Sequence, residues 1–151
     1  MIISTLAYIE KNEKFLMLYR NKKENDINEG KWVGVGGKLE ANESPDECIK
    51  REIFEETGLK AQQLKLKGFI TFVNTICESE LIFIYTVSDY SGDLIDCNEG
   101  TLEWIDKEKV LSLNLWEGDR YFLTPILKNE DRFINIKFVY DADDLIEVVE
   151  M

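Results

Sequence analysis

Short apolar segments separated by polar turns make up most of the chain, and their composition predicts β-strands. The segments are rich in Ile, Leu, Val, Phe and Tyr, which favour strands, and residues 132–140 alternate apolar and polar side chains in part. Polar residues between them, at 10–13, 74–80 and 89–100, are typical of turns and loops. The predicted strands are residues 2–9, 14–19, 64–73, 81–88, 101–105, 132–140 and 145–149.

One helix with well-defined ends is predicted over residues 45–57. Ser44 is a good N-cap, and Pro45 occupies the first helical position, where its missing N–H costs nothing. Glu47 completes a Ser-x-x-Glu capping box. Gly58, which is free to adopt the left-handed conformation, ends the helix.

Two shorter helical segments are predicted in the C-terminal half. Asp106 is positioned to cap a turn over residues 107–111, and residues 119–128 form an amphipathic helix that Pro125 shortens or bends. Strands, a helix, strands, a second helix and strands again indicate an α+β fold. A chain of this length is expected to form a single domain, residues 1–151.

The first helix carries three acids whose spacing predicts a common face. At 3.6 residues per turn, Glu52, Glu55 and Glu56 fall within a sector of roughly 100°. Ile49 and Ile53 lie beside this sector, so the acids border the buried edge of the helix. Acids grouped in this way repel each other unless they share a cation, and hard cations such as Mg²⁺ take oxygen ligands. The pattern therefore favours a metal–phosphate site over a solvated acidic face.

Residues around this helix add candidate partners. Arg51 can hold a carboxylate in a bidentate grip, and Glu43 in the preceding loop is available for it. Residues 32–38 form a short strand that runs into a glycine-rich turn, where the backbone permits close approach. Taken alone, this turn is a weak indication of a phosphate-binding loop.

Nine positions between residues 37 and 59 form a pattern specific enough to compare with known families. They are Gly37, Glu43, Arg51, Glu52, Ile53, Glu55, Glu56, Gly58 and Leu59. Their spacing resembles the signature of the Nudix hydrolases, which cleave a nucleoside diphosphate linked to another group X and use Mg²⁺ or Mn²⁺. The resemblance implies the Nudix fold, an α/β/α sandwich with a mixed sheet.

The same resemblance implies catalytic and metal-binding roles. The metal ligands it implies are the Gly37 carbonyl, Glu52, Glu55, Glu56 and Glu99. Glu52 is the first choice for general base because the family usually gives that role to the Glu after the Arg, and Glu99 is the second. Glu99 matches a loop position that often supplies a ligand in this family, although it is also compatible with an ordinary loop acid. Arg51 and Glu43 are expected to support the geometry of the site.

Phosphate contacts are expected from basic residues on either side of the glycine-rich turn. Arg20 and Lys23 belong to the polar loop over residues 20–31, where they would either clamp phosphates or only aid solubility. The resemblance places Lys38 near the phosphates.

The similarity extends over most of the chain and includes the MutT-type bacterial 8-oxo-dGTP diphosphatases. Purine-specific relatives place an aromatic ring near the position of Phe72. A Trp-x-Asp-Asp stretch that reads the purine in animal-type relatives matches Trp116 and Asp119. Gly118 replaces the first Asp of that stretch, and Val33 replaces an Asn that those relatives use on the base, so the base preference is left open.

The resemblance implies a nucleoside triphosphate pyrophosphohydrolase that converts 8-oxo-dGTP to 8-oxo-dGMP and pyrophosphate. Other substrates of the same signature are dinucleoside polyphosphates, ADP-ribose and capped RNA ends. A catalytically dead nucleotide-binding regulatory domain is a third hypothesis, which the complete set of glutamates disfavours.

The composition of the chain limits the kinds of binding partner that we expect. The net charge of −12 disfavours binding to duplex nucleic acid, because that binding relies on Lys and Arg, whereas a small nucleotide can bring its own metal ions. The absence of histidine excludes His-based catalytic triads and His-ligated metal sites.

No apolar run is long enough for a membrane span and no secretory signal is seen, so membrane association is not expected. Three widely spaced cysteines, Cys48, Cys77 and Cys97, indicate reduced thiols in a cytoplasm. The choice between monomer and homodimer stays open.

Overall fold

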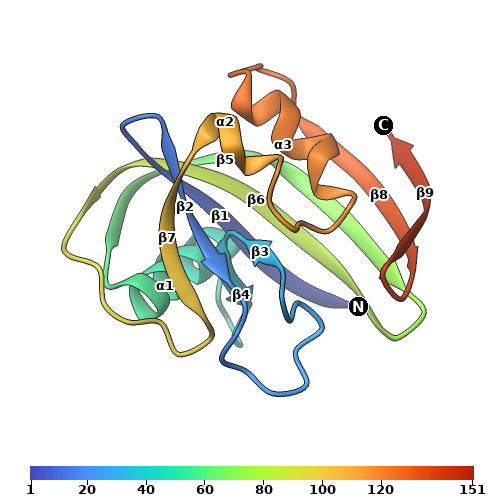
Figure 1. Cartoon of the computed structure of the whole chain (residues 1–151). Coiled ribbons are helices and arrows are strands. Elements are labelled where there is room, and N and C mark those ends of the chain that lie inside the picture. The colour runs from blue at the N-terminus through green and yellow to red at the C-terminus, as the bar shows by residue number, and fades with distance from the viewer.

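The computed structural model describes all 151 residues, and nine strands of one mixed sheet dominate it (Figure 1). The strands are β1 (Ile2–Lys11), β2 (Lys14–Tyr19), β3 (Trp32–Val33), β4 (Val35–Lys38), β5 (Lys60–Asn74), β6 (Cys77–Ser91), β7 (Thr101–Asp106), β8 (Ile134–Asp141) and β9 (Asp144–Glu150). The helices are α1 (Pro45–Thr57), α2 (Lys107–Val110) and α3 (Asp119–Leu127). The predicted α+β class is confirmed.

The sheet mixes parallel and antiparallel pairs. Its main path runs β3-β2-β1-β6-β5-β8-β9, while β4 also pairs with β1 and β7 with β2. The pairs β1–β6 and β5–β8 are parallel, and the other pairs are antiparallel. Parallel neighbours require long crossover connections, and here these connections contain the helices. The path therefore brings the N-terminal strand next to strands from the middle of the chain.

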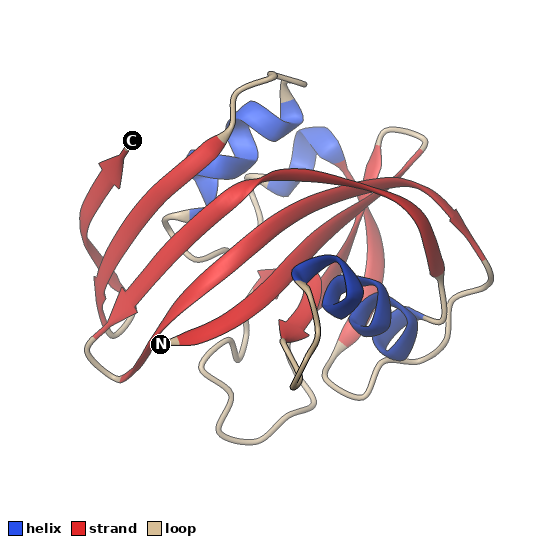
Figure 2. Cartoon of the chain, turned by 180° about the vertical axis from the view of Figure 1, so that it is seen from behind, coloured by secondary structure: helices blue, strands red, loops and turns tan.

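Helices cover both faces of the sheet. Figures 1 and 2, which view the chain from opposite sides, show α1 on one face and α2 and α3 on the other. The fully buried ring of Tyr8 in β1 packs α3 onto the sheet. Its centroid lies 5.7 Å from that of Phe15 in β2 and 6.0 Å from that of Phe122 in α3. This arrangement is the predicted α/β/α sandwich with a mixed sheet.

The ends of α1 follow the predicted capping pattern. The Glu47 N–H donates to Ser44 Oγ at 3.1 Å, and the Ser44 N–H donates to the Glu47 carboxylate at 2.9 Å. Gly58 adopts φ 80°, and its N–H donates to the carbonyl of Phe54. Both ends of this helix are therefore fixed by interactions local to the sequence.

Three predictions about the other elements were wrong in detail. The polar connection predicted over residues 74–80 is a two-residue turn, because β5 continues to Asn74 and β6 already begins at Cys77. The Asn74 side chain shortens the turn by accepting the Ile76 N–H at 3.2 Å. The predicted loop over residues 89–100 likewise begins only after β6 ends at Ser91. Asp106 precedes a four-residue helix but makes no capping hydrogen bond with its side chain.

No helix is both long enough and apolar enough to cross a membrane.

Candidate active site

Gly37 brings the end of β4 into direct contact with the acidic helix. A Cβ atom at position 37 would lie 2.5 Å from the carboxyl carbon of Glu52, so any other residue would displace this carboxylate. The Gly37 carbonyl accepts a hydrogen bond from Thr5 Oγ1 at 3.2 Å, and residues 5 and 37 are paired between β1 and β4. The sheet thus fixes the backbone at the point where the Glu52 carboxylate packs on it.

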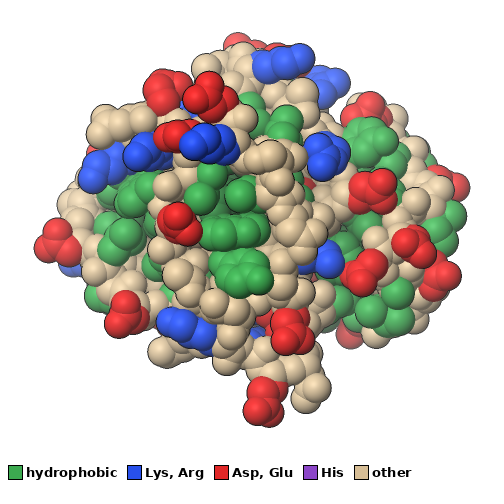
Figure 3. All heavy atoms as spheres, viewed as in Figure 1, with side chains coloured by type: hydrophobic (Ala, Val, Ile, Leu, Met, Phe, Trp, Pro, Cys, Tyr) green, Lys and Arg blue, Asp and Glu red, His purple; other side chains and the backbone are tan.

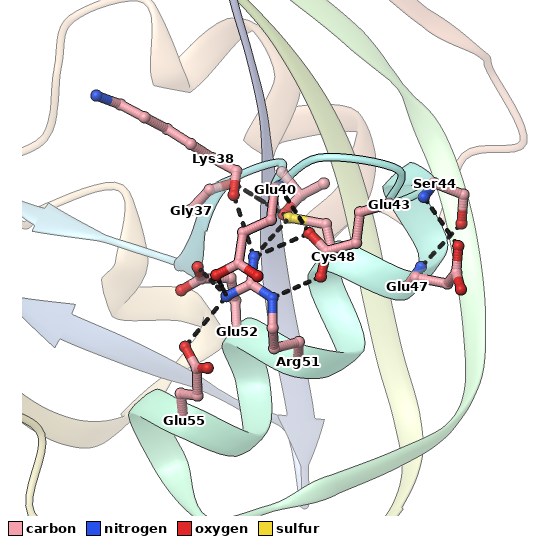
Figure 4. A network of polar contacts seen from close by, with 11 residues as sticks. Gly37, Lys38, Glu40, Glu43, Ser44, Glu47, Cys48, Arg51, Glu52 and Glu55 are labelled. Atoms are coloured by element: carbon pink, nitrogen blue, oxygen red, sulfur yellow. Dashed lines mark hydrogen bonds and ion pairs between the residues drawn. The ribbon is translucent and has the colours of Figure 1, made fainter.

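Arg51 is the centre of a network of acids, shown in Figure 4. Its guanidinium donates twice to Glu43, at 2.5 and 2.9 Å, which is the bidentate pairing expected from the sequence. It also donates to Glu52 at 2.8 Å, to Glu55 at 3.1 Å and to the Lys38 carbonyl at 3.1 Å. The hydrogen bonds from Arg51 lower the pKa of Glu43 to about 2. The loop before α1 and the acidic face of α1 are therefore joined through one side chain.

Glu56 and Glu99 form a second group of acids, in which Glu56 is buried and Glu99 is partly exposed. Glu56 is 7% exposed and accepts the Gly36 N–H at 3.0 Å. Burial raises the pKa of Glu56 well above its usual range, and the adjacent Glu99 carboxylate raises it further. Two neighbouring carboxylates that disfavour each other's charge are a suitable donor set for a hard divalent cation.

The acids of the two groups do not surround a common point at which a metal ion could bind. No group of three or more Asp, Glu, Cys or His side chains is close enough to hold a metal ion. The reason lies in the ion pairs, since Arg51 holds Glu52 and Glu55 while Glu99 pairs with Arg20 at 3.2 Å. Burial also raises the pKa of Glu52 above its ordinary value, against the opposing effect of Arg51.

The basic residues predicted to bind phosphate differ in whether they already form ion pairs with acids of the protein. Arg20 donates to Asp26 at 2.7 Å as well as to Glu99, and Lys23 lies 3.8 Å from Glu99. Lys38 is exposed, and Figure 4 shows its side chain extending away from the Arg51 network. Lys38 is thus the predicted phosphate contact that is free of ion pairs.

One pocket of about 700 Å³ connects these charged groups with an aromatic end. The predicted site residues that line it are Arg20, Lys23, Gly37, Lys38, Glu52, Phe72, Glu99, Trp116 and Asp119. Four other predicted residues, Glu43, Arg51, Glu55 and Glu56, do not line it. The predicted substrate-binding residues therefore all line one pocket, whereas only Glu52 and Glu99 of the proposed metal-binding glutamates do so.

Aromatic rings enclose the end of the pocket away from α1. The Trp116 ring packs edge-on against Phe72 at 5.3 Å and against Tyr140 at 5.1 Å. Trp116 Nε1 donates to Asn28 Oδ1 at 2.7 Å, and Lys31 Nζ lies 4.5 Å from the ring centroid. These contacts hold the indole in one orientation and give the aromatic end rigid walls.

Asp119, the first residue of α3, brings a carboxyl group to this aromatic end. Its side chain is half-buried and makes no hydrogen bond with the protein. Burial raises the pKa of Asp119 to about 8, while the charge of Lys31 acts in the opposite direction. A carboxyl group without a partner at a pocket wall is available to a polar ligand.

Sequence reasoning missed several residues of the aromatic end. Tyr140, Asn28 and Lys31 position Trp116, yet none of them was among the predicted site residues. The alternation along β8 contained a usable signal, because every second residue from Ile134 to Tyr140 is buried. Asn28 and Lys31 come from an irregular loop, where no periodicity marks an inward side chain.

Comparison with known proteins shows the family to which this chain belongs. The sequence profile of the NUDIX domain matches residues 2–125. The chain belongs to the Nudix hydrolase family. Nudix hydrolases act on small nucleotide substrates and generally use a divalent metal ion.

Individual relatives cover most of the chain. The oxidized purine nucleoside triphosphate hydrolase of Danio rerio is 30% identical over 126 residues, which are 82% of this chain and 79% of the relative. The uncharacterized Nudix hydrolase YvcI of Bacillus subtilis is 29% identical and spans 83% of this chain and 79% of its own. The crystal structure of a MutT protein from Bacillus halodurans superposes with a TM-score of 0.88, at 29% identity, over 99% of this chain and 97% of that one.

Proposed function

We propose that this Nudix hydrolase is a Mg²⁺-dependent nucleoside triphosphate pyrophosphohydrolase that acts on oxidised purine nucleotides. The substrate would be 8-oxo-dGTP or a similar nucleotide, and the products the monophosphate and pyrophosphate. The observation that carries the proposal is that one pocket is lined both by Glu52 and Glu99 and by Phe72, Trp116 and Asp119. The name of the zebrafish relative supports the same substrate class.

Metal binding would involve the acids of α1 and the loop before β7. Glu52, Glu55, Glu56, Glu99 and the Gly37 carbonyl are the proposed ligands, and all of them offer the oxygen atoms that Mg²⁺ or Mn²⁺ prefers. A bound ion of this kind polarises phosphoryl oxygens and lowers the pKa of a coordinated water. Binding would also remove the mutual repulsion of Glu56 and Glu99.

Water attack on phosphorus requires a proton acceptor. Glu52 is the proposed general base, and Glu99 is the second candidate. The water proton passes to the carboxylate, the water oxygen bonds to one phosphorus of the α–β bridge, and the bond from that phosphorus to the bridging oxygen breaks, which gives the monophosphate and pyrophosphate. Arg51 and Glu43 would keep Glu52 in place, because one guanidinium contacts both carboxylates.

Substrate charge and substrate shape would be read at opposite ends of the pocket. Lys38 is free to contact a phosphate, and Arg20 and Lys23 could do so once Glu99 turns to a cation. Phe72 and Trp116 pack edge-on against each other, and together they would form an aromatic wall against which a purine could lie. These aromatic walls favour a nucleotide with one large base over a chain of phosphates alone.

A substrate panel tests the proposal. Purified protein with Mg²⁺ is supplied with 8-oxo-dGTP, dGTP, ADP-ribose and diadenosine tetraphosphate, and the products are separated by ion exchange. The proposal predicts preferential release of 8-oxo-dGMP and pyrophosphate. Preferential cleavage of ADP-ribose or of the dinucleotide would reject the proposed substrate class, and no cleavage of any compound would reject the enzymatic role.

A further inference from the structure

A second pocket, of about 320 Å³, lies between strands β5 and β6 and the C-terminal end of α3 (Figure 1). It shares no lining residue with the pocket of the candidate active site. Only two of its nine lining residues are hydrophobic, and two of the others are Lys65 and Lys67. In a chain with a net charge of −12, a polar pocket with two lysines in its wall is a candidate site for an anion.

Lys67 is the one basic residue that is buried, with 8% of its surface exposed. Its ammonium donates to the Glu130 carbonyl at 3.2 Å, and it forms none of the ion pairs of the structure. An ammonium group has three hydrogens to donate, and burial of its charge is unfavourable without an opposite charge nearby. Lys67 therefore has unused donors and no counter-charge from the protein.

The backbone around Lys67 forms a β-bulge. The register of β5 against β6 shifts between Leu66 and Gly68, which leaves Lys67 without a paired residue on β6. Gly68 adopts φ 143°, and a Cβ atom there would lie 2.0 Å from the carbonyl oxygen of Ile134 in β8. Bulges redirect the side chains of the strand that contains them. The buried position of this lysine is therefore set by the backbone and not by an ion pair.

Lys65, Thr86 and Ser88 add donors to the same wall. Lys65 is paired with Thr86 across β5 and β6. Ser88 lies two residues further along β6, so its side chain is on the same face as that of Thr86, and all three residues line the pocket. Ammonium and hydroxyl groups are donors that suit the oxygens of a phosphate. Together with Lys67, the wall offers two positive charges and two hydroxyl groups.

The acids near the pocket do not cancel these charges. Glu10, the one carboxylate in its wall, pairs with Lys107 at 3.0 Å. The Asp131 carboxylate lies 3.9 Å from Lys65 Nζ, but the Asp131 side chain is fully exposed, so this ion pair is weak. The pocket therefore keeps a net positive charge, which favours a negatively charged ligand.

We propose that this second pocket binds a small oxyanion of the phosphate class. The oxygens of the anion accept from Lys65 and Lys67 and from the hydroxyls of Thr86 and Ser88. The anion supplies the counter-charge that Lys67 lacks in the protein alone. Since no residue of this pocket belongs to the candidate active site, the proposal does not depend on the proposed hydrolysis.

Amide NMR spectra of isotope-labelled, metal-free protein test the proposal during titration with inorganic phosphate. Sodium chloride holds the ionic strength constant, so that general screening does not change. The amide signals of residues 63–67 and 86–88 should shift and reach saturation. A separate titration with pyrophosphate shows which of the two anions fits better. If neither anion gives saturable shifts at these residues, the proposal is wrong.

A pair of lysine variants identifies the group responsible. Lys67→Met keeps an apolar stem but removes the charge, so phosphate affinity should fall about tenfold or more. Lys60→Met is the matched control, because Lys60 is an exposed lysine of the same strand outside the pocket, and its affinity should stay close to that of the wild type. Unchanged affinity in Lys67→Met would overturn the proposal. Should that variant not fold, Thr86→Val removes one hydroxyl at similar shape and should weaken binding severalfold, and unchanged binding there rejects the proposal as well.

Discussion

At the scale of single residues, Arg51 explains how several acids coexist on one helix. It donates to Glu43, Glu52 and Glu55 together, so like charges are offset before any cation binds. Glu56 is buried next to Glu99 and pairs with no basic side chain, whereas Glu99 pairs with Arg20 at 3.2 Å. The site therefore contains one group of acids joined by Arg51 and a second group in which Glu56 has no basic partner.

Removing the charge of Glu52 should abolish most of the turnover with little effect on folding. In Glu52→Gln the amide keeps the shape of the side chain but cannot accept the proton of water, so kcat should fall by roughly 10² to 10⁴. Steady-state hydrolysis of 8-oxo-dGTP and thermal unfolding measure the two effects. Glu108→Gln, on the exposed face of α2, is the control. Near-normal turnover in Glu52→Gln would exclude Glu52 as the base.

Glu56 should make the metal-free protein less stable as the pH rises. Its folded-state pKa lies above the ordinary value of 4.5, so it stays protonated in the folded protein while the unfolded chain ionises. The stabilisation is complete below pH 4.5 and is lost as the pH rises toward the folded pKa, by at most about 1.4 kcal/mol per pH unit for one proton. Chemical denaturation in EDTA between pH 5 and 8 measures this slope.

The matched variant is Glu56→Gln, which cannot ionise. Its unfolding free energy should vary less with pH than that of the wild type, and Mg²⁺ should stabilise it less. An identical pH dependence in both proteins would show that Glu56 is not the group responsible.

At the scale of elements, α1 and β4 form one unit through the contact between Gly37 and Glu52. We predict that Gly37→Ala lowers kcat at least tenfold, because the new methyl group would displace the Glu52 carboxylate. Ser44→Ala is the contrasting variant. It should cost about 1 kcal/mol of stability through the lost cap, measured by urea denaturation, while kcat stays close to normal. Equal activity in Gly37→Ala and the wild type would show that the close packing is not needed.

Elements whose ends are set by residues close in the sequence were predicted correctly, and features that depend on contacts between distant residues were not. Ser44, Glu47 and Gly58 act within one helix, and the predicted boundaries of α1 were confirmed. The β5–β6 hairpin was predicted too short because polar residues near its turn, such as Glu78 and Glu80, belong to the strands themselves. The pairing of Gly118 with Tyr140 depends on a contact between α3 and β8, which no local pattern encodes.

At the scale of the whole molecule, the sheet joins distant segments into one site. The parallel pairing of β1 with β6 and of β5 with β8 brings the loop after β2, the acidic helix and the start of α3 around one pocket. The family resemblance identified the acidic end and also Phe72, Trp116 and Asp119 of the aromatic end, whereas Tyr140, Asn28 and Lys31 became apparent only from the fold. Acidic side chains spread over the face drawn in Figure 3 and gather at its edge over the C-terminal strands. We expect a surface this negative to repel duplex nucleic acid, whose binding relies on Lys and Arg.

A crystal structure with Mg²⁺ and a non-hydrolysable analogue of 8-oxo-dGTP tests the central claim most directly. We predict metal ions at Glu52, Glu56 and Glu99, phosphates near Lys38, and the base against the aromatic wall that Phe72 and Trp116 form. An ordered analogue whose base lies away from that wall, or α1 acids that remain bound to Arg51 with no ion beside them, would contradict this claim.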